Sequence, residues 1–128
     1  MKVLQSVTAA VFVLVFCPVA ASAQGDKCPR GYSNDDCDKW HFERADIVLT
    51  EAIDRKIAQS SSMTTSPDIR DEIKRTALEA HRAWVAYREA ECKAYAVANV
   101  TSARTQQGKY ASCLLRLTEQ RVAELNKP

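Results

Sequence analysis

The side chains with the clearest potential for chemistry in this chain are its cysteines. The 128-residue sequence has five, and four of them follow the first two dozen residues: Cys28, Cys37, Cys92 and Cys113. A structural metal site favours Cys-x-x-Cys or closely spaced Cys and His ligands, whereas these cysteines lie 9, 55 and 21 positions apart. An even set at such spacings predicts two disulfides and no metal.

Residues suited to catalysis are few. The chain has two histidines, His41 and His81, and lacks His-Glu-x-x-His, Gly-x-Ser-x-Gly and any glycine-rich phosphate loop. Glu89 and Glu91 lie two positions apart on a predicted helix, so their carboxylates point to different faces and cannot act together as an acid and a base. We therefore expect a protein that is not an enzyme and needs no cofactor.

The first 23 residues are typical of a secretory signal peptide. They combine Lys2, an apolar run over residues 7–16, the helix breaker Pro18 and an Ala-Ser-Ala sequence at 21–23. A lipoprotein would need a small residue before Cys17, where Phe16 stands. Cleavage after Ala23 leaves one predicted domain, residues 24–128, which is expected to be periplasmic or secreted.

The charge balance argues against several classes of partner. Only Lys2 of the 18 Lys and Arg residues lies in the leader, so 17 remain against 16 Asp and Glu, a net charge of +1. Such a balance is not typical of a nucleic-acid-binding protein. No apolar segment after the leader is long enough to span a membrane. Neither nucleic acid nor a membrane is therefore the expected partner.

Apolar residues recur at steps of three and four, which predicts three helices, over about 35–59, 67–98 and 109–126. The first helix has its apolar stripe at Ala45, Val48, Leu49, Ala52, Ile53 and Ile57. The predicted contact line of the second is Ile73, Ala77, Ala80, Trp84, Tyr87, Glu91, Ala94 and Ala98. That of the third is Tyr110, Leu114, Leu117, Arg121 and Glu124. Ser66-Pro67-Asp68 begins the second helix, and the polar residues 99–108 are predicted to form a connection.

Three helices with short connections predict an all-α, up-down-up bundle, which brings all four cysteines to one end. Local pairing, Cys28 with Cys37 and Cys92 with Cys113, is preferred because each bridge would then join a loop to a helix end. The crossed pairings remain open. A Cys92–Cys113 bridge across antiparallel helices would place Trp84 opposite Arg121, and Glu91 opposite Leu114 with a need for a hydrogen-bond donor.

Two segments resemble a known family. They are Trp84-Val-Ala-Tyr87-Arg88-Glu-Ala-Glu91-Cys92 and Tyr110-x-x-Cys113-x-x-x-Leu117-Thr118-x-x-Arg121-x-x-Glu124-Leu125. Both are similar to the lysozyme-inhibitor LprI-like N-terminal domain family, as is Ala45-Asp46-x-x-Leu49. The chain departs from the family where Thr50 replaces the usual Asn and Ile53 replaces the usual Tyr. The resemblance covers roughly residues 28–126.

This resemblance implies an exported, disulfide-bonded helical domain, and the family name implies that it binds and inhibits lysozyme. The motif residues other than cysteine lie at core spacing, so we expect them to build the bundle: Trp84, Tyr87, Arg88, Glu91, Leu117, Thr118, Arg121 and Leu125. They are therefore not the expected binding surface.

The predicted connection between the second and third helices is the candidate inhibitory loop. Lysozyme cleaves peptidoglycan with two carboxylates in a cleft, which a protein can block with cations and hydrogen-bond donors. Arg104, Gln106, Gln107 and Lys109 supply such groups beside a predicted disulfide. The alternatives are a non-inhibitory periplasmic module that binds an envelope protein and, less favoured, an immunity-like protein against a cell-wall toxin. The class of lysozyme and the oligomeric state stay open.

Overall fold

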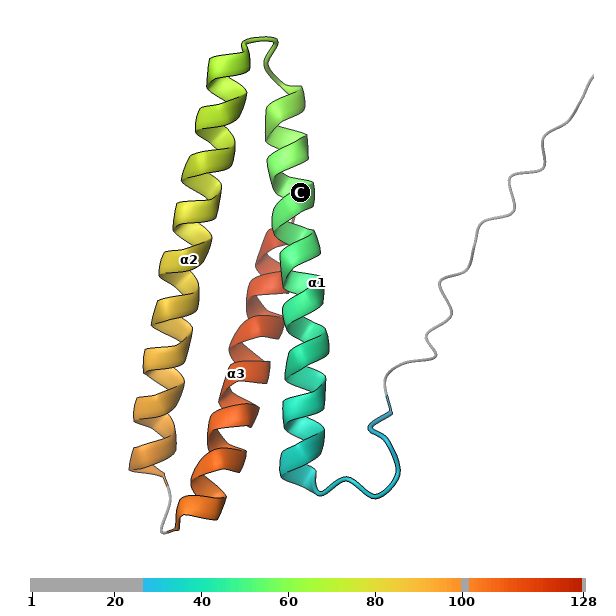
Figure 1. The fold of residues 1–128 in the computed structure, drawn as a ribbon, viewed down its shortest axis with the longest axis vertical. Helices are drawn as coiled ribbons and strands as arrows, with labels where there is room; N and C mark the ends of the chain where they lie inside the picture. The colour runs from blue at the N-terminus through green and yellow to red at the C-terminus, as the bar shows by residue number, and fades with distance from the viewer. Residues whose placement is uncertain (1–26, 100–101, 128) are drawn as a thin grey trace, which may run out of the picture.

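The fold is a bundle of three long helices. The computed structural model describes residues 27–99 and 102–127, and its elements are α1 (Asn34–Ser62), α2 (Pro67–Ala98) and α3 (Ala103–Leu125). They run up, down and up, with α1 packed most extensively against α3 (Figure 1). The predicted all-α bundle is confirmed, whereas the predicted signal peptide lies outside the described residues.

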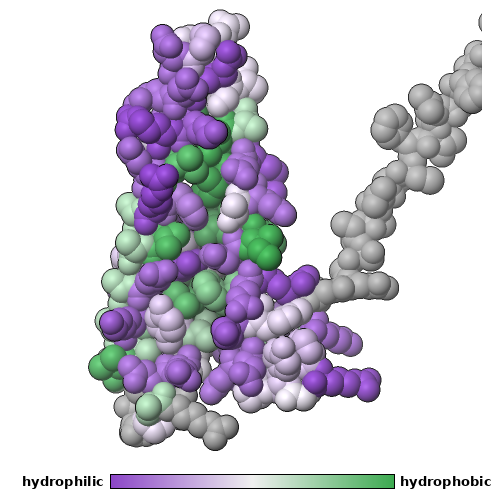
Figure 2. Space-filling view, viewed as in Figure 1, coloured by the Kyte–Doolittle hydropathy of each residue, from purple (hydrophilic) through white to green (hydrophobic). Residues whose placement is uncertain are grey.

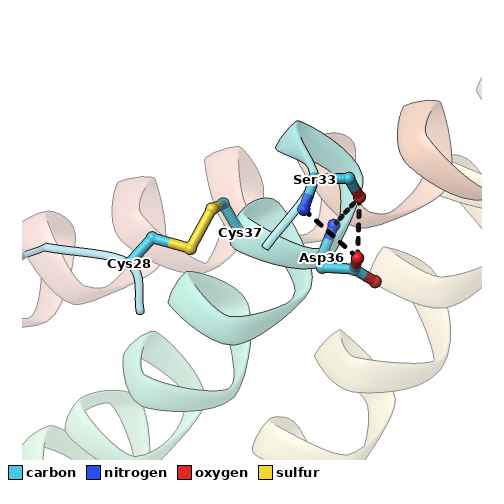
Figure 3. Close-up of a disulfide and its surroundings, with 4 residues drawn as sticks. All are labelled: Cys28, Ser33, Asp36 and Cys37. Atoms are coloured by element: carbon cyan, nitrogen blue, oxygen red, sulfur yellow. Dashed lines mark hydrogen bonds between the residues drawn. A yellow bond between two sulfur atoms is a disulfide. The ribbon is translucent and has the colours of Figure 1, made fainter. Parts of the chain in front are cut away.

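The beginnings of α1 and α2 follow local sequence signals. Ser33 and Asp36 form a capping box on α1, in which the Ser33 hydroxyl donates to Asp36 Oδ2 over 2.7 Å and also accepts from the Asp36 N–H (Figure 3). Pro67 occupies the first turn of α2, where its missing N–H has no intrahelical partner to lose. Local sequence signals therefore place both helix starts within one residue of the prediction.

Both disulfides have the predicted local pairing. Cys28 is bonded to Cys37 beside the α1 capping box (Figure 3), and Cys92 of α2 is bonded to Cys113 of α3. The Cα atoms of each pair lie 5.4 Å apart, within the usual range for a disulfide. Cys92 and Cys113 are buried and, with Leu114, form the centre of a cluster that Phe42, Tyr110 and Leu117 surround.

The predicted connection over residues 99–108 is too long, because α3 already begins at Ala103. Ser102 is its N-cap and accepts a hydrogen bond from the Thr105 N–H. Gly108 lies inside the helix, where it is buried and where an added Cβ would overlap the Asp35 carboxylate. This glycine permits a close approach of α1 and α3 and does not end a loop.

The predicted buried face of α2 is wrong beyond Trp84. Tyr87 is 56% exposed and Glu91 is also exposed, whereas Arg88, Cys92 and Ala96 are buried. A straight α-helix has 3.6 residues per turn, so a line with a 3.5-residue repeat drifts away from its partner. From Trp84 onward the buried residues of α2 are four positions apart, at Arg88, Cys92 and Ala96. Glu91 faces solvent and therefore needs no hydrogen-bond donor from within the protein.

We expect the two disulfides to differ in their contribution to stability. Replacing Cys92 and Cys113 together by Ala should lower the free energy of unfolding by about 2–4 kcal/mol. The Cys28→Ala/Cys37→Ala variant is the matched control, and it should lose less because its bridge is less buried. The Cys28–Cys37 bridge also closes a shorter loop than Cys92–Cys113, 9 against 21 positions. In a chain-entropy model this difference alone makes the loss of stability about 0.7 kcal/mol smaller. Urea unfolding of both variants measures the difference, and equal losses would contradict this expectation.

Gly108→Ala should be better tolerated without Asp35 than with it. In the native sequence the added methyl group meets only the exposed Asp35 carboxylate, which can turn away, so this contact should offset part of the helix-propensity gain of about 1 kcal/mol. In an Asp35→Ala background the overlap is gone, and the full gain of up to about 1 kcal/mol in the free energy of unfolding should appear. A double-mutant cycle by urea unfolding tests this, and identical effects in both backgrounds would exclude the close contact.

Candidate functional site

A buried set of polar contacts surrounds Arg88. Its side chain is 3% exposed, and its Nη1 donates to Asp46 Oδ1 over 2.6 Å and to Thr118 Oγ1 over 2.8 Å. Asp46 belongs to α1, Arg88 to α2 and Thr118 to α3. A single guanidinium therefore links all three helices.

Aromatic rings surround the same guanidinium. Arg88 Cζ lies 4.9 Å from the ring centroid of Phe42 and 5.2 Å from that of Trp84. The Arg88 Nε is buried and has no hydrogen-bond acceptor among the described residues. The two ring faces therefore supply the attraction on this side of the cation.

A second cation confirms the predicted register between α2 and α3. Arg121 Cζ lies 5.8 Å from the Trp84 ring centroid, as a Cys92–Cys113 bridge predicts. Arg121 also donates from Nη1 to Glu124 over 3.1 Å. The α2 residue that packs against Leu114 is the buried Cys92 and not Glu91.

The motif residues fall into three groups in the structure. Trp84, Arg88, Thr118 and Arg121 lie together between the helices, and Leu117 packs against the disulfide cluster. Leu125 lies at the far end of α3, where it lines a notch with Ile53, Ile57 and His81. Tyr87 and Glu91 lie on the surface, so the prediction that they build the core is wrong.

Sequence reasoning missed Asp46 and Phe42 as the α1 partners of Arg88. Asp46 had been noted only as part of the Ala45-Asp46-x-x-Leu49 pattern. Its position beside the apolar stripe of the first helix was the available signal. The group that needs a partner is the buried Arg88, and the half-exposed Asp46 accepts its hydrogen bond.

The candidate inhibitory residues occupy the first turns of α3 and not a loop. Gln107 and Lys109 are exposed and Gln106 is half-buried, while the Arg104 side chain lies outside what the structure describes. Gln106 and Gln107 line a cavity of about 330 Å³ with Lys93, Ala96 and Tyr110. The structure thus brings three of the four residues to the disulfide end, and their role in inhibition stays a prediction.

The described side chains offer little for catalysis. In residues 27–99 and 102–127, no group of three or more His, Cys, Asp or Glu side chains is placed to hold a metal ion. The pKa of Glu72 is lowered because Arg75 donates a hydrogen bond to its carboxylate and adds an attractive charge, and that of Arg75 is raised in return. This pair is solvent-exposed on α2, which is typical of an ordinary surface ion pair.

Comparison with known protein families matches residues 26–125 to the lysozyme inhibitor LprI. The chain belongs to the LprI family of lysozyme inhibitors. Comparisons with curated proteins and with solved structures find no match. The LprI match includes both disulfides. It also includes Arg88 and the side chains that contact it, so these residues lie in the part of the chain that the family defines. The family is one of inhibitors and is not catalytic.

The two disulfides of this LprI domain are typical of proteins outside the reducing cytosol. Within the part of the chain that the structure covers, no helix combines the length and apolar character needed to cross a membrane.

Replacing Asp46 by Ala should destabilise the bundle by about 1–3 kcal/mol. Breaking a buried ion pair typically costs about 3–5 kcal/mol, but the Asp46 side chain is 45% exposed and water screens part of the lost attraction. Asp54→Ala is the matched control, since Asp54 is an exposed acid on the same helix and its loss should change stability by less than about 0.5 kcal/mol. Urea unfolding measures both, and equal values would show that Arg88 does not depend on Asp46.

Proposed function

We propose that this LprI-family protein is exported, binds lysozyme and inhibits it without catalysing a reaction of its own. The family match over residues 26–125 is the observation that supports this function most directly. The two disulfides support it further, because an inhibitor that acts outside the cell must stay folded there.

We place the inhibitory surface at the disulfide end of the bundle, on the first turns of α3. Lys109 and Gln107 are exposed there, and Lys93 of α2 lies beside Gln106 and Gln107. The Cys92–Cys113 bridge ties these two helices together next to this surface. Side chains on a rigid helix lose less conformational entropy on binding than side chains on a loop, so the helical conformation favours this role.

Binding at this surface depends on local contacts. Animal-type lysozymes are generally basic, and a domain with a net charge of about +1 gains no long-range attraction to them. Hydrogen-bond donors from Gln106 and Gln107, together with the Lys109 cation, are the groups that suit the acidic cleft of the enzyme.

The exposed side of α2 favours a protein partner even if lysozyme is not inhibited. Tyr87, Tyr95 and Val97 are exposed large side chains on this helix. Aromatic residues of this kind are enriched in protein interfaces. The second candidate function is therefore a non-inhibitory periplasmic module that binds an envelope protein through this side.

The function is tested by following bacterial cell-wall lysis as a loss of turbidity. Animal-type, invertebrate-type and goose-type lysozymes are each assayed with and without a molar excess of oxidised residues 24–128. We expect inhibition of at least one class, and loss of inhibition after the disulfides are reduced. Undiminished lysis by all three classes would reject lysozyme inhibition and favour the envelope-protein module.

The surface is tested by the Arg104→Ala/Lys109→Ala variant. We expect it to stay helical and to raise the concentration needed for half-inhibition about ten-fold, which corresponds to about 1.4 kcal/mol of binding free energy. Arg70→Ala/Lys74→Ala removes two exposed cations at the opposite end of α2 and is the matched control. Unchanged inhibition by the first variant, or an equal loss in both, would place the inhibitory surface elsewhere.

A further inference from the structure

One exposed face of α1 borders a hollow between α1 and α3 and has an unusual composition for an exposed surface. Ile47 is 61% exposed and Val48 is 43% exposed, and exposed charges flank them at Arg44 and Glu51. These four residues are spaced by three, four and seven positions, so they form one stripe along the helix. Leu49, on the opposite side of α1, is completely buried. We call the stripe of Arg44, Ile47, Val48 and Glu51 the α1 outer face.

The charges on the α1 outer face are arranged so that the face is complementary to itself. Arg44 and Glu51 lie at equal distances, in opposite directions, from the midpoint between Ile47 and Val48. A two-fold axis through this midpoint brings an antiparallel second copy of α1 into contact. Arg44 of each copy then meets Glu51 of the other, and Ile47 of each meets Val48 of the other. A parallel copy would instead place Arg44 against Arg44.

The same symmetry extends one turn further in each direction. Trp40 and Arg55 are also equidistant from the midpoint, so each Arg55 would face the Trp40 ring of the other copy. Trp40 already accepts a cation on its ring, since Arg44 Cζ lies 4.8 Å from its centroid. Arg55 is held in position by its hydrogen bond to Asn126 Oδ1 over 3.2 Å.

Apolar surface continues from the α1 outer face toward α3. A hollow of about 710 Å³ lies between the two helices, and Ala45, Val48, Val122 and Ala123 provide its apolar lining. Figure 2 shows a hydrophobic patch at the α1 edge about half-way along the bundle, surrounded by hydrophilic side chains. An apolar centre with a polar rim is the usual composition of a protein interface.

We propose that the α1 outer face is a self-association site, where two copies of this chain pair through antiparallel α1 helices into a symmetric dimer. The contact is isologous: each copy contributes the same residues, and two Arg44–Glu51 ion pairs flank the apolar centre. With a net charge near zero, the two copies approach without strong mutual repulsion. This dimer is independent of the surface proposed for inhibition.

Sedimentation velocity of the purified oxidised protein tests the dimer, over about 10 µM to about 1 mM, the range in which small interfaces associate. We expect the native sequence to dimerise as its concentration rises. Arg44→Glu places only acids at the flanking positions, Glu51→Arg places only bases there, and each variant alone should be monomeric throughout. Glu89→Arg reverses an exposed acid on α2 and should dimerise like the native sequence.

Mixing the two variants gives the decisive result. In a mixed pair, both acids of the Arg44→Glu chain meet both bases of the Glu51→Arg chain, so an equimolar mixture should form heterodimers. The doubly reversed Arg44→Glu/Glu51→Arg chain should also recover self-association. If the Arg44→Glu chain loses helicity, the doubly reversed chain and Ile47→Asp test the dimer in its place. Ile47→Asp removes the apolar centre and should be monomeric.

Three outcomes would overturn the dimer. A native chain that stays monomeric at about 1 mM excludes it, as does dimerisation that neither single reversal weakens. Single reversals that are monomeric both alone and when mixed also exclude the antiparallel arrangement. If the native chain is monomeric and the reversals abolish lysozyme inhibition, the α1 outer face belongs to the lysozyme contact.

Discussion

A guanidinium that is almost completely removed from water must be surrounded by acceptors or ring faces, and Arg88 meets this demand with groups from all three helices. Asp46 and Thr118 accept its hydrogen bonds, while Phe42 and Trp84 cover its faces. Burying this charge without these partners would be strongly unfavourable. The face that α2 buries beyond Trp84 also satisfies this constraint, because a helix that turns Arg88 inward turns its neighbour Tyr87 toward solvent.

The parts of the fold that the sequence predicts correctly depend on local signals. Ser33 marks a helix start by capping and Pro67 by its preference for the first turn, while the three- and four-residue steps identify the helices themselves. The prediction that Gly108 ends a loop is wrong because its place in the helix depends on a contact with a distant part of the chain. A glycine at the end of a polar segment indicates a break in the helix, unless it is known that Asp35 of a distant helix occupies the space beside it.

Of the contacts around Arg88 and Trp84, the sequence predicts those between α2 and α3 but not those with α1. The Cys92–Cys113 bridge defines the register between α2 and α3, and from it the contact of Trp84 with Arg121 follows. The other bridge closes a short loop before and into α1, so no covalent link relates α1 to either of the other helices. Without such a link, the pairing of Asp46 with Arg88 across 42 positions could not be derived from spacing.

The unequal lengths of the helices divide the bundle into two mechanically different parts. Arg55 and Lys56 of α1 contact Asn126 and Lys127 at the end of α3, and beyond this level α1 and α2 continue as a two-helix hairpin (Figure 1). Both disulfides and the buried cation lie on the three-helix side. Local opening of the hairpin tip therefore breaks none of these contacts, and its amide hydrogens can exchange with solvent while the disulfide end stays closed. The molecule thus has a rigid end and a compliant end, and the surface proposed for inhibition lies on the rigid one.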